Sequence, residues 1–368
     1  IYFGEPRGQR TNARGERERD VLAVAEAAVS FTQSNMIFPD ASSRRVSVRV
    51  QSNQAGKNGR LVLDLPDGWK ASPASYEVGL ERLGQESVFD FEVTPPQAES
   101  GGKLAARLEL DGKSVSTGMR VIEYSHIPIQ VVFPRAEMRV ERTDVVLLSK
   151  NIGYVMGAGD EIPEALEQLG ATVKLLGETE LATGDLAAYD SIVLGVRALD
   201  TRPDVTASRE RLLDYVAKGG TLVVQYNVML RGRRGGDPME RMLAPYPLEP
   251  FSGGGDRPNR ITDENSPIEI LLADHPLLQT PNHIRPKDFD GWVQERGLYF
   301  MQEWDPRYEA PWTSHDEGQP SIPGGTLYAK YGEGTYVFTA YSWFRELPNG
   351  VPGAYRIFAN IVSAGQTK

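Results

Sequence analysis

The residues best suited to chemistry gather in one short segment, KDFDGWVQERGLYF, at positions 287–300. It contains three carboxylates, an indole and a guanidinium: Asp288, Asp290, Glu295, Trp292 and Arg296. Two carboxylates could hydrolyse a glycosidic bond over a tryptophan that stacks on the sugar, and such oxygen ligands also bind Ca²⁺. The structural alternative is a loop whose acids and bases pair with each other while its aromatic residues anchor it to the core. We expect chiefly an anchored loop, with ligand binding as its second role.

A second group lies in GYVMGAGDEIPEAL at 153–166, between an expected strand and an expected helix. Ligands of parallel sheets bind beyond the carboxyl ends of the strands, where helix N-termini offer free N–H donors. Asp160 or Glu161 could therefore orient an anion or a sugar hydroxyl. The alternative is that the glycines form a tight turn and Asp160 caps the helix. GxGD is not the dinucleotide-binding pattern GxGxxG, and no phosphate-binding lysine follows it.

Three further polar residues are expected near the same edge. Arg197 and Asn227 follow apolar runs that predict strands, and Arg345 lies beside aromatic residues in SWFRELPNGVPGAYR at 342–356. Since the carboxyl ends of parallel strands meet at one edge, these residues and the 288–296 segment are predicted to form one polar cluster there.

The composition excludes several kinds of site. The 368 residues include no cysteine, so thiol nucleophiles, disulfides and thiolate metal sites are impossible. The four histidines show no HxxxH or HxH spacing, and no expected strand end carries a GxSxG nucleophile motif. We therefore predict no catalytic residue, metal or cofactor in this chain. A net charge of −10 argues against nucleic acid as a partner, and no apolar run is long enough to span a membrane.

The N-terminal half is expected to be rich in strands. Residues 1–35 predict an arm with a short helix at Val21–Phe31, where apolar residues repeat at helical spacing. Residues 36–125 alternate apolar and polar side chains between turn clusters, which predicts an antiparallel β-sandwich of the immunoglobulin type. Residues 126–145 contain two prolines and show no clear period, so they are interpreted as a linker.

The C-terminal part, 146–368, alternates short apolar runs with amphipathic segments that end in glycine. This pattern predicts an α/β domain of the flavodoxin-like or class I glutamine amidotransferase-like type, built on a parallel sheet. The Gly- and Pro-rich stretch of about 228–325 predicts a long insertion over one end of that sheet. The chain as a whole is thus expected to be a mixed multi-domain protein.

Several stretches resemble known families. LPDGWKASP at 65–73 is similar to small sandwich domains of the NEW3 type appended to bacterial glycosidases. KNIGYVMGAGDEIPEALEQLG, KDFDGWVQERGLYFMQEWDPRYEAP and SWFRELPNGVPGAYRIFANI together resemble the C-terminal half of large bacterial PIG-L (LmbE-like) deacetylases. The resemblance covers most of 40–365 and implies a parent protein that removes acetyl groups from N-acetylated amino sugars and is exported.

The zinc motif of that family, of the form HPDDE, has no match in this chain. The resemblance therefore implies an accessory region that positions an upstream zinc deacetylase domain or binds its glycan. The start at Ile1, without methionine, favours a piece of a longer protein. Two alternatives stay open. One is a stand-alone hydrolase that uses the carboxylates of Asp288–Glu295, and the other is an assembly module that forms an oligomer.

Overall fold

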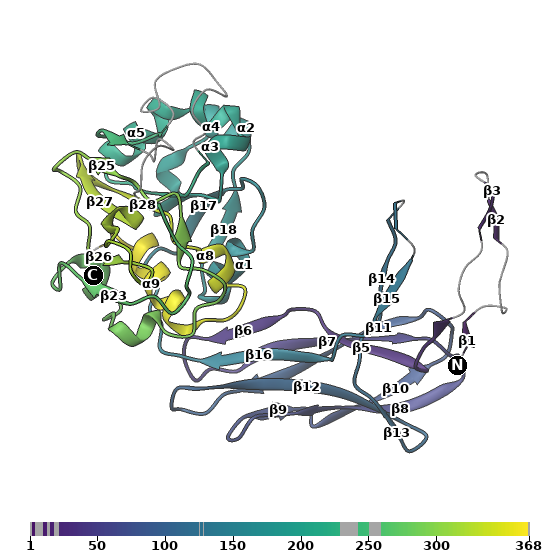
Figure 1. Ribbon diagram of the computed structural model, residues 1–368. Helices are drawn as coiled ribbons and strands as arrows, with labels where there is room; N and C mark the ends of the chain where they lie inside the picture. Colours follow the sequence, from purple (N-terminus) through teal and green to yellow (C-terminus); the bar gives the residue numbers. More distant parts are fainter. Residues whose placement is uncertain are drawn as a thin grey trace. The chain divides into compact units, whose positions relative to one another are not determined.

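The computed structural model describes residues 2–3, 10–12, 15–17, 22–124, 126–127, 129–228, 242–249 and 259–366. The chain is a mixed α/β protein with several sheets, and it divides into two compact units, Ile1–Thr143 and Asp144–Lys368 (Figure 1). Each unit is described by itself.

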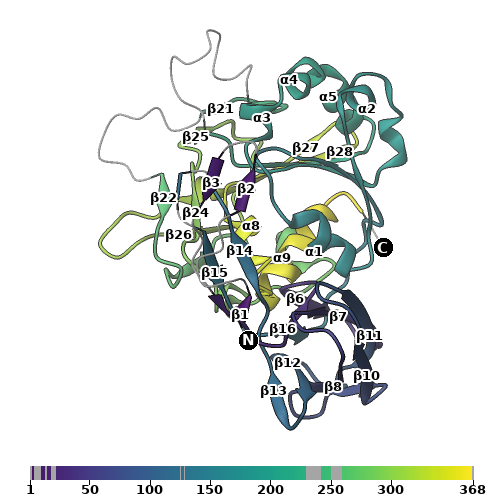
Figure 2. The ribbon, with the colours of Figure 1, turned by 90° about the vertical axis from the view of Figure 1, so that its right-hand side faces the viewer.

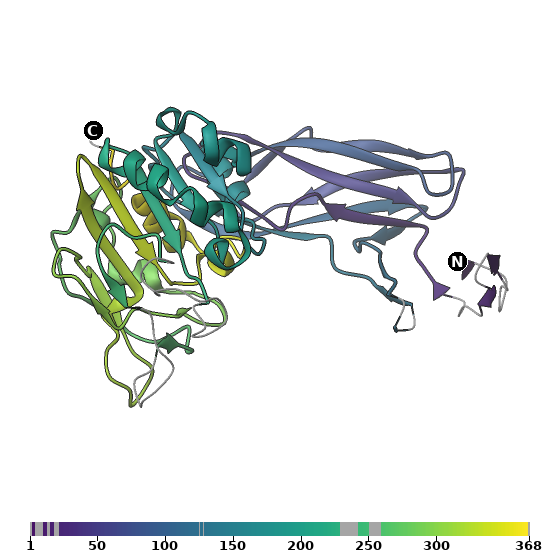
Figure 3. The ribbon, with the colours of Figure 1, turned by 90° about the horizontal axis from the view of Figure 1, so that it is seen from above.

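Two sheets build the first unit, and Figure 3 shows them as two layers. One has the order β10-β8-β12-β16-β6, with β13 paired to β12, and the other has the order β5-β7-β11-β9. Their bounds are β5 Ala27–Phe31, β6 Asn35–Phe38, β7 Arg44–Ser52, β8 Lys57–Asp64, β9 Lys70–Ser72, β10 Ser75–Leu80, β11 Glu86–Thr94, β12 Ser100–Leu110, β13 Lys113–Val115 and β16 Glu137–Arg142. Both sheets contribute to one apolar core, because alternate side chains of strands such as β7 and β12 are buried.

Three two-stranded ribbons complete this unit: β1 with β4, β2 with β3, and β14 with β15. Their bounds are β1 Tyr2–Phe3, β2 Arg10–Asn12, β3 Gly15–Arg17, β4 Leu22–Ala23, β14 Arg120–Ile122 and β15 Gln130–Val132.

Two expectations for this unit are wrong. The helix expected at Val21–Phe31 is absent, because Ala27–Phe31 forms β5 and pairs antiparallel with β7. A short apolar run fits either period, and pairing with a long neighbouring strand decides the outcome. The linker expected at 126–145 contains β15 and β16, and β16 lies between β12 and β6 inside the sheet. Met138 and Val140 alternate with charged residues, a strand signal that the preceding prolines obscured.

A six-stranded sheet of order β18-β17-β19-β20-β28-β27 forms the centre of the second unit. Its strands are β17 Asn151–Val155, β18 Thr172–Leu175, β19 Ser191–Leu194, β20 Thr221–Gln225, β27 Thr326–Tyr331 and β28 Gly334–Thr339. Four of the five pairings are parallel, and only β27 with β28 is antiparallel. All residues of β19, β20 and β28 are buried, as expected for strands covered on both faces.

Helices cover both faces of this sheet: α2, α4 and α5 lie on one side, and α1 and α9 lie on the other (Figure 2). The helical elements here are α1 Ile162–Gln168, α2 Glu178–Thr183, η1 Leu186–Ala188, α3 Ala198–Thr201, α4 Pro203–Ala207, α5 Arg209–Ala217, α8 Trp343–Glu346 and α9 Pro352–Val362. The predicted glycine ends of two helices are confirmed, since Gly170 and Gly219 have φ of +86° and +109°.

The described part of 228–325 forms only short elements. They are β21 Leu248–Glu249, β22 Arg260–Ile261, β23 Ile268–Ile270, α7 Pro276–Gln279, η2 Pro286–Phe289, β24 Gly297–Leu298, β25 Glu303–Trp304, β26 Trp312–Ser314 and η3 Pro323–Gly325. The Leu298 amide donates to the Ala340 carbonyl at 3.1 Å, just beyond the end of β28. This contact places the 288–300 segment at the carboxyl edge of the sheet.

Candidate functional site

Three aromatic rings meet at the carboxyl edge of the sheet. Tyr226 directly follows β20, Phe344 lies in α8 just after β28, and Tyr299 follows β24. The Tyr226 ring centre lies 5.5 Å from that of Tyr299 and 5.6 Å from that of Phe344. All three side chains are half-buried. We call these three residues, with Arg197, Glu295 and Arg345, the carboxyl-edge platform.

The charged members of the platform border the rings. The Arg345 guanidinium donates to Glu295 Oε1 at 3.2 Å and lies 4.9 Å from the centre of the Phe344 ring. Arg197 is exposed, and its backbone amide donates to the Tyr226 carbonyl at 2.9 Å. Burial first, and then the neighbouring Tyr299 and Glu295, raises the pKa of Tyr226 above its usual value. The phenol therefore stays neutral and can both donate and accept hydrogen bonds.

The backbone of the platform is strained. Only five non-glycine residues with positive φ occur among the described residues, and three of them belong to this edge. Arg197 has φ of 61°, Gln294 has 69° and Tyr299 has 65°. Such conformations cost energy and persist where the surrounding structure fixes them, which happens often at binding sites. Their concentration here marks the platform as the strongest candidate site.

Asn227 fixes the backbone beside the platform through hydrogen bonds. It is buried, its Oδ1 accepts from the Leu199 amide at 2.8 Å, and its Nδ2 donates to the Gln225 carbonyl at 2.8 Å. These bonds tie the end of β20 to the first turn of α3, directly after Arg197. Of the predicted polar cluster, the structure thus brings together Arg197, Asn227, Glu295 and Arg345.

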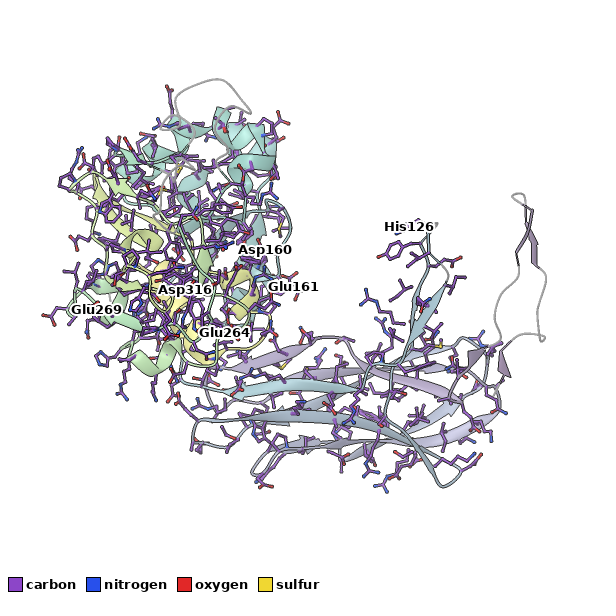
Figure 4. The ribbon with its side chains drawn as sticks, viewed as in Figure 1. His126, Asp160, Glu161, Glu264, Glu269 and Asp316 are labelled. Carbon is purple, nitrogen blue, oxygen red and sulfur yellow. The ribbon has the colours of Figure 1, made fainter. Side chains whose placement is uncertain are left out.

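The predicted site residues Asp160 and Glu161 lie next to each other, at the start of α1 (Figure 4). Asp160 Oδ1 accepts from the Tyr154 hydroxyl at 2.7 Å and from the Ile162 amide at 3.1 Å. Burial raises the pKa of the Asp160 carboxyl, although these hydrogen bonds oppose the shift. The Glu161 side chain is exposed at the N-terminus of α1 and makes no capping bond. The helix-capping alternative therefore describes Asp160 better than a ligand role does.

The two aspartates of the 287–300 segment do not point to one reaction centre. Asp288 is buried and forms an ion pair with Arg356 of α9, and its second oxygen accepts from the Arg285 amide at 2.8 Å. Asp290 is exposed. A paired-carboxylate site would need these aspartates or Glu295 to face one ligand. Both oxygens of Asp288 instead bind Arg356 and the Arg285 amide, so Asp288 does not take part in such a site.

Arg296 and Trp292 belong to the core. Arg296 is 4 % exposed, and its guanidinium donates to the backbone carbonyls of Ser266 and Phe289. It also lies 5.2 Å from the centre of the Trp292 ring, which packs 5.1 Å from the Trp343 ring. Burial lowers the pKa of Arg296. The expectation that the acids and bases of this loop pair with each other is wrong for Arg296, because backbone oxygens occupy its donors. The expectation that aromatic residues anchor the loop is confirmed.

Glu346 is a buried carboxylate that was not among the predicted site residues. Its side chain is fully buried at the end of α8, where Oε2 accepts from the Val293 amide at 3.0 Å and Oε1 has no hydrogen-bond partner. Burial raises its pKa to about 8, while Arg296 and Arg345 oppose the shift. Its place in the sequence, beside Arg345 in a short polar turn, gives no signal of this burial.

Metal-ligating side chains do not gather in the residues that the structure describes. No group of three or more His, Asp or Glu side chains there is arranged to hold a metal ion. None of the helices in these residues is long and apolar enough to cross a bilayer.

No family model matches this chain, and no curated protein matches it. Among solved structures it is similar to the cytoplasmic protein STM3548 of Salmonella typhimurium, with 12 % identity, a TM-score of 0.37, and 67 % of this chain and 94 % of that chain covered. It is also similar to a β-galactosidase of Rahnella sp. R3, with 16 % identity, a TM-score of 0.33, and coverage of 58 % and 31 %. At these TM-scores the similarity carries no information on fold family or function.

Proposed function

We propose that this chain is a non-catalytic recognition region that binds a glycan on the carboxyl-edge platform. The observation that carries the proposal is the cluster of three half-buried rings, Tyr226, Tyr299 and Phe344, beside the Arg345–Glu295 pair. Ligands of open parallel sheets bind at this edge. The platform combines ring faces with charged hydrogen-bonding groups, which supports binding as its role.

Sugars suit this combination of side chains. The apolar C–H face of a pyranose packs on aromatic rings, and tyrosine adds a hydroxyl at the wet end of its ring. A guanidinium offers a planar set of donors, and a carboxylate offers acceptors, so Arg345 and Glu295 can bind neighbouring hydroxyls. Arg345 pairs with Glu295 and Arg197 pairs with Asp200, so the charges beside the rings compensate each other. The site therefore favours a neutral sugar over a strongly charged one.

The wider setting we propose follows the family resemblance. The PIG-L-like stretches at 287–311 and 342–361 contact each other. Trp292 packs on Trp343, Glu295 pairs with Arg345, and Asp288 pairs with Arg356. We therefore propose an exported accessory region, a β-sandwich followed by a flavodoxin-like domain. It would hold the glycan of an upstream zinc deacetylase domain, and no zinc would bind in this chain.

Titration calorimetry with a tetramer of N-acetylglucosamine tests the proposal. Tyr226→Ala removes the central ring and should weaken binding about 5- to 30-fold, which corresponds to about 1–2 kcal/mol of lost stacking. Tyr226→Phe keeps the ring and should stay within a few-fold of wild type. Tyr124→Ala, at an exposed tyrosine of the other unit, is the matched control.

Two results would contradict the proposal. One is equal binding by the Tyr226→Ala variant and the wild type, and the other is no binding of the tetramer or of other neutral glycans by the folded wild type. Turnover of the tetramer that Glu295→Gln abolishes, with folding intact, would instead support the hydrolase alternative.

A further inference from the structure

The ribbon of β14 and β15 exposes an unusual amount of apolar surface. It pairs with no other strand of the described residues. Of the eleven large hydrophobic side chains that are exposed in the described part of the chain, five lie on or beside this ribbon: Val121 52 %, Tyr124 58 %, Ile127 40 %, Val132 42 % and Phe133 42 %. Figure 4 shows His126 at its tip. Because a lone two-stranded ribbon is only marginally stable in water, this surface calls for a partner.

Hydrogen bonds at the base of the ribbon show which backbone groups face outward. The Gly118 amide donates to the Pro134 carbonyl at 2.8 Å, so these two opposite residues form a hydrogen-bonded pair. In an antiparallel ribbon such pairs alternate with pairs whose N–H and C=O groups point away. Val132, which is opposite Arg120, therefore points its backbone groups inward. Val131 and Phe133 point theirs to the free edge of β15.

The two edges of the ribbon differ in charge. The β14 edge carries Arg120 and Glu123, whereas no charged residue occurs from Ile127 to Phe133. Natural proteins place charges on edge strands that must stay unpaired. Pro134 has no N–H, but at this position the N–H would point inward toward β14. The outward-facing backbone groups of β15 are therefore complete in spite of the proline. The β15 edge is therefore the one open to another strand.

We propose that the β15 edge pairs antiparallel with β15 of a second copy of this chain, about a two-fold axis at Val131. In this register Val131 faces its own counterpart, Gln130 faces Val132, and Ile129 faces Phe133. No like charges meet, and every outward-pointing backbone group faces another one. The result is a four-stranded sheet with the charged β14 strands on its outer edges, an arrangement that satisfies the ribbon and blocks further growth.

The second copy is favoured over other occupants by this self-complementarity. A closed two-fold dimer is the commonest assembly of identical chains. A lipid surface fits less well, because the open backbone edge would lose its water without gaining hydrogen bonds. The contact is small compared with the roughly 1,200 Å² that stable interfaces bury, so the dimer should form reversibly with rising concentration.

Sedimentation velocity of the full chain, from low micromolar to several hundred micromolar, tests this dimer. The wild type should shift from monomer to dimer across this range. Val131→Pro removes an outward N–H without touching the β14–β15 bonds and should weaken the dimer at least 10-fold. Val121→Pro makes the same change on the outward side of β14 and should leave the dimer unchanged.

A charge exchange gives a second test that loss of folding cannot imitate. Val131→Lys and Val131→Glu each place like charges opposite each other, so either variant alone should be monomeric. An equimolar mixture places opposite charges across the axis and should restore a heterodimer. A wild type that stays monomeric throughout, equal loss in the Val121→Pro variant, or no recovery in the mixture would overturn the proposal.

Discussion

Replacing Glu346 by glutamine is expected to stabilise the protein at alkaline pH and to change little at pH 4.5. The carboxyl of Glu346 is fully buried, with one hydrogen bond from the Val293 amide and one oxygen without a partner. Its charged form is therefore poorly solvated, although Arg296 and Arg345 partly offset the cost of burial. Glutamine has the shape of the protonated acid and keeps the acceptor for Val293.

The size of the effect follows from the pKa. In the folded protein the pKa of Glu346 is about 8, against an ordinary value of 4.5. Each tenfold change in an ionisation constant corresponds to about 1.4 kcal/mol, so the full difference is about 5 kcal/mol. Below pH 4.5 both states hold the proton. Between pH 4.5 and 8 only the folded state holds it, so stability falls as pH rises, and the loss is complete above pH 8.

Urea unfolding followed by tryptophan fluorescence at pH 4.5, 6, 7.5 and 9 measures this difference. The free energy of unfolding of Glu346→Gln should exceed that of the wild type by several kcal/mol at pH 9 and by less than about 1 kcal/mol at pH 4.5. Glu269→Gln removes an exposed carboxylate and is the control. A Glu346→Gln variant that differs from wild type by the same amount at every pH would refute the argument.

Two further predictions concern the second unit. Burial lowers the pKa of His275 to about 4, and its Nδ1 accepts from the Leu277 amide at 3.1 Å. The neutral histidine contributes stability that is fully present above pH 6.5 and is lost as the pH falls toward 4, because only the unfolded state takes up the proton in that range. His275→Asn should therefore flatten the plot of unfolding free energy against pH between 6.5 and 4. The measurement uses the Glu346→Gln background, which removes the pH dependence of Glu346. Gly353→Ala should destabilise by roughly 3 kcal/mol in urea unfolding, because the added methyl group would lie 1.9 Å from the Asp288 carbonyl oxygen. Gly79→Ala, whose methyl group meets only a side-chain oxygen at 3.6 Å, should stay within about 1 kcal/mol of wild type.

The central sheet of the second unit could be predicted from the sequence because its signals are local. Short apolar runs such as Ser191–Leu194 and Thr221–Gln225 are buried on both faces, and glycines end the helices between them. Each strand carries its own evidence in four or five residues. The hairpin of Thr326–Tyr331 and Gly334–Thr339 is equally local, with a two-residue Gly-containing turn.

The first unit was harder to predict at its two ends, where pairing with distant strands decides the structure. Ala27–Phe31 has apolar residues that suit a helix as well as a strand, and only its pairing with Arg44–Ser52 makes it a strand. Glu137–Arg142 follows two prolines, yet it lies between Ser100–Leu110 and Asn35–Phe38. Neither partner is apparent within a short window of sequence.

The candidate site shows the same limit at the level of single side chains. Asp288, Trp292 and Arg296 have the residue types of a sugar site, but the fold uses them to fix the loop to α9 and to the core. Glu295 and Tyr299, in the same segment, belong to the platform instead. Residue type therefore pointed to this segment as part of the candidate site. It did not predict which of its side chains would be accessible to a ligand.

The platform depends on backbone conformations that the sequence does not favour. Neither arginine at 197 nor tyrosine at 299 prefers a positive φ, and glycine would adopt it at lower cost. Arg197 is fixed because its amide donates to the Tyr226 carbonyl and because Asn227 ties the following turn to β20. A side chain is thus retained where glycine would be easier for the backbone. The Arg197 side chain also forms an ion pair, with its Nε 3.5 Å from Asp200 Oδ2, and this contact would be lost with glycine.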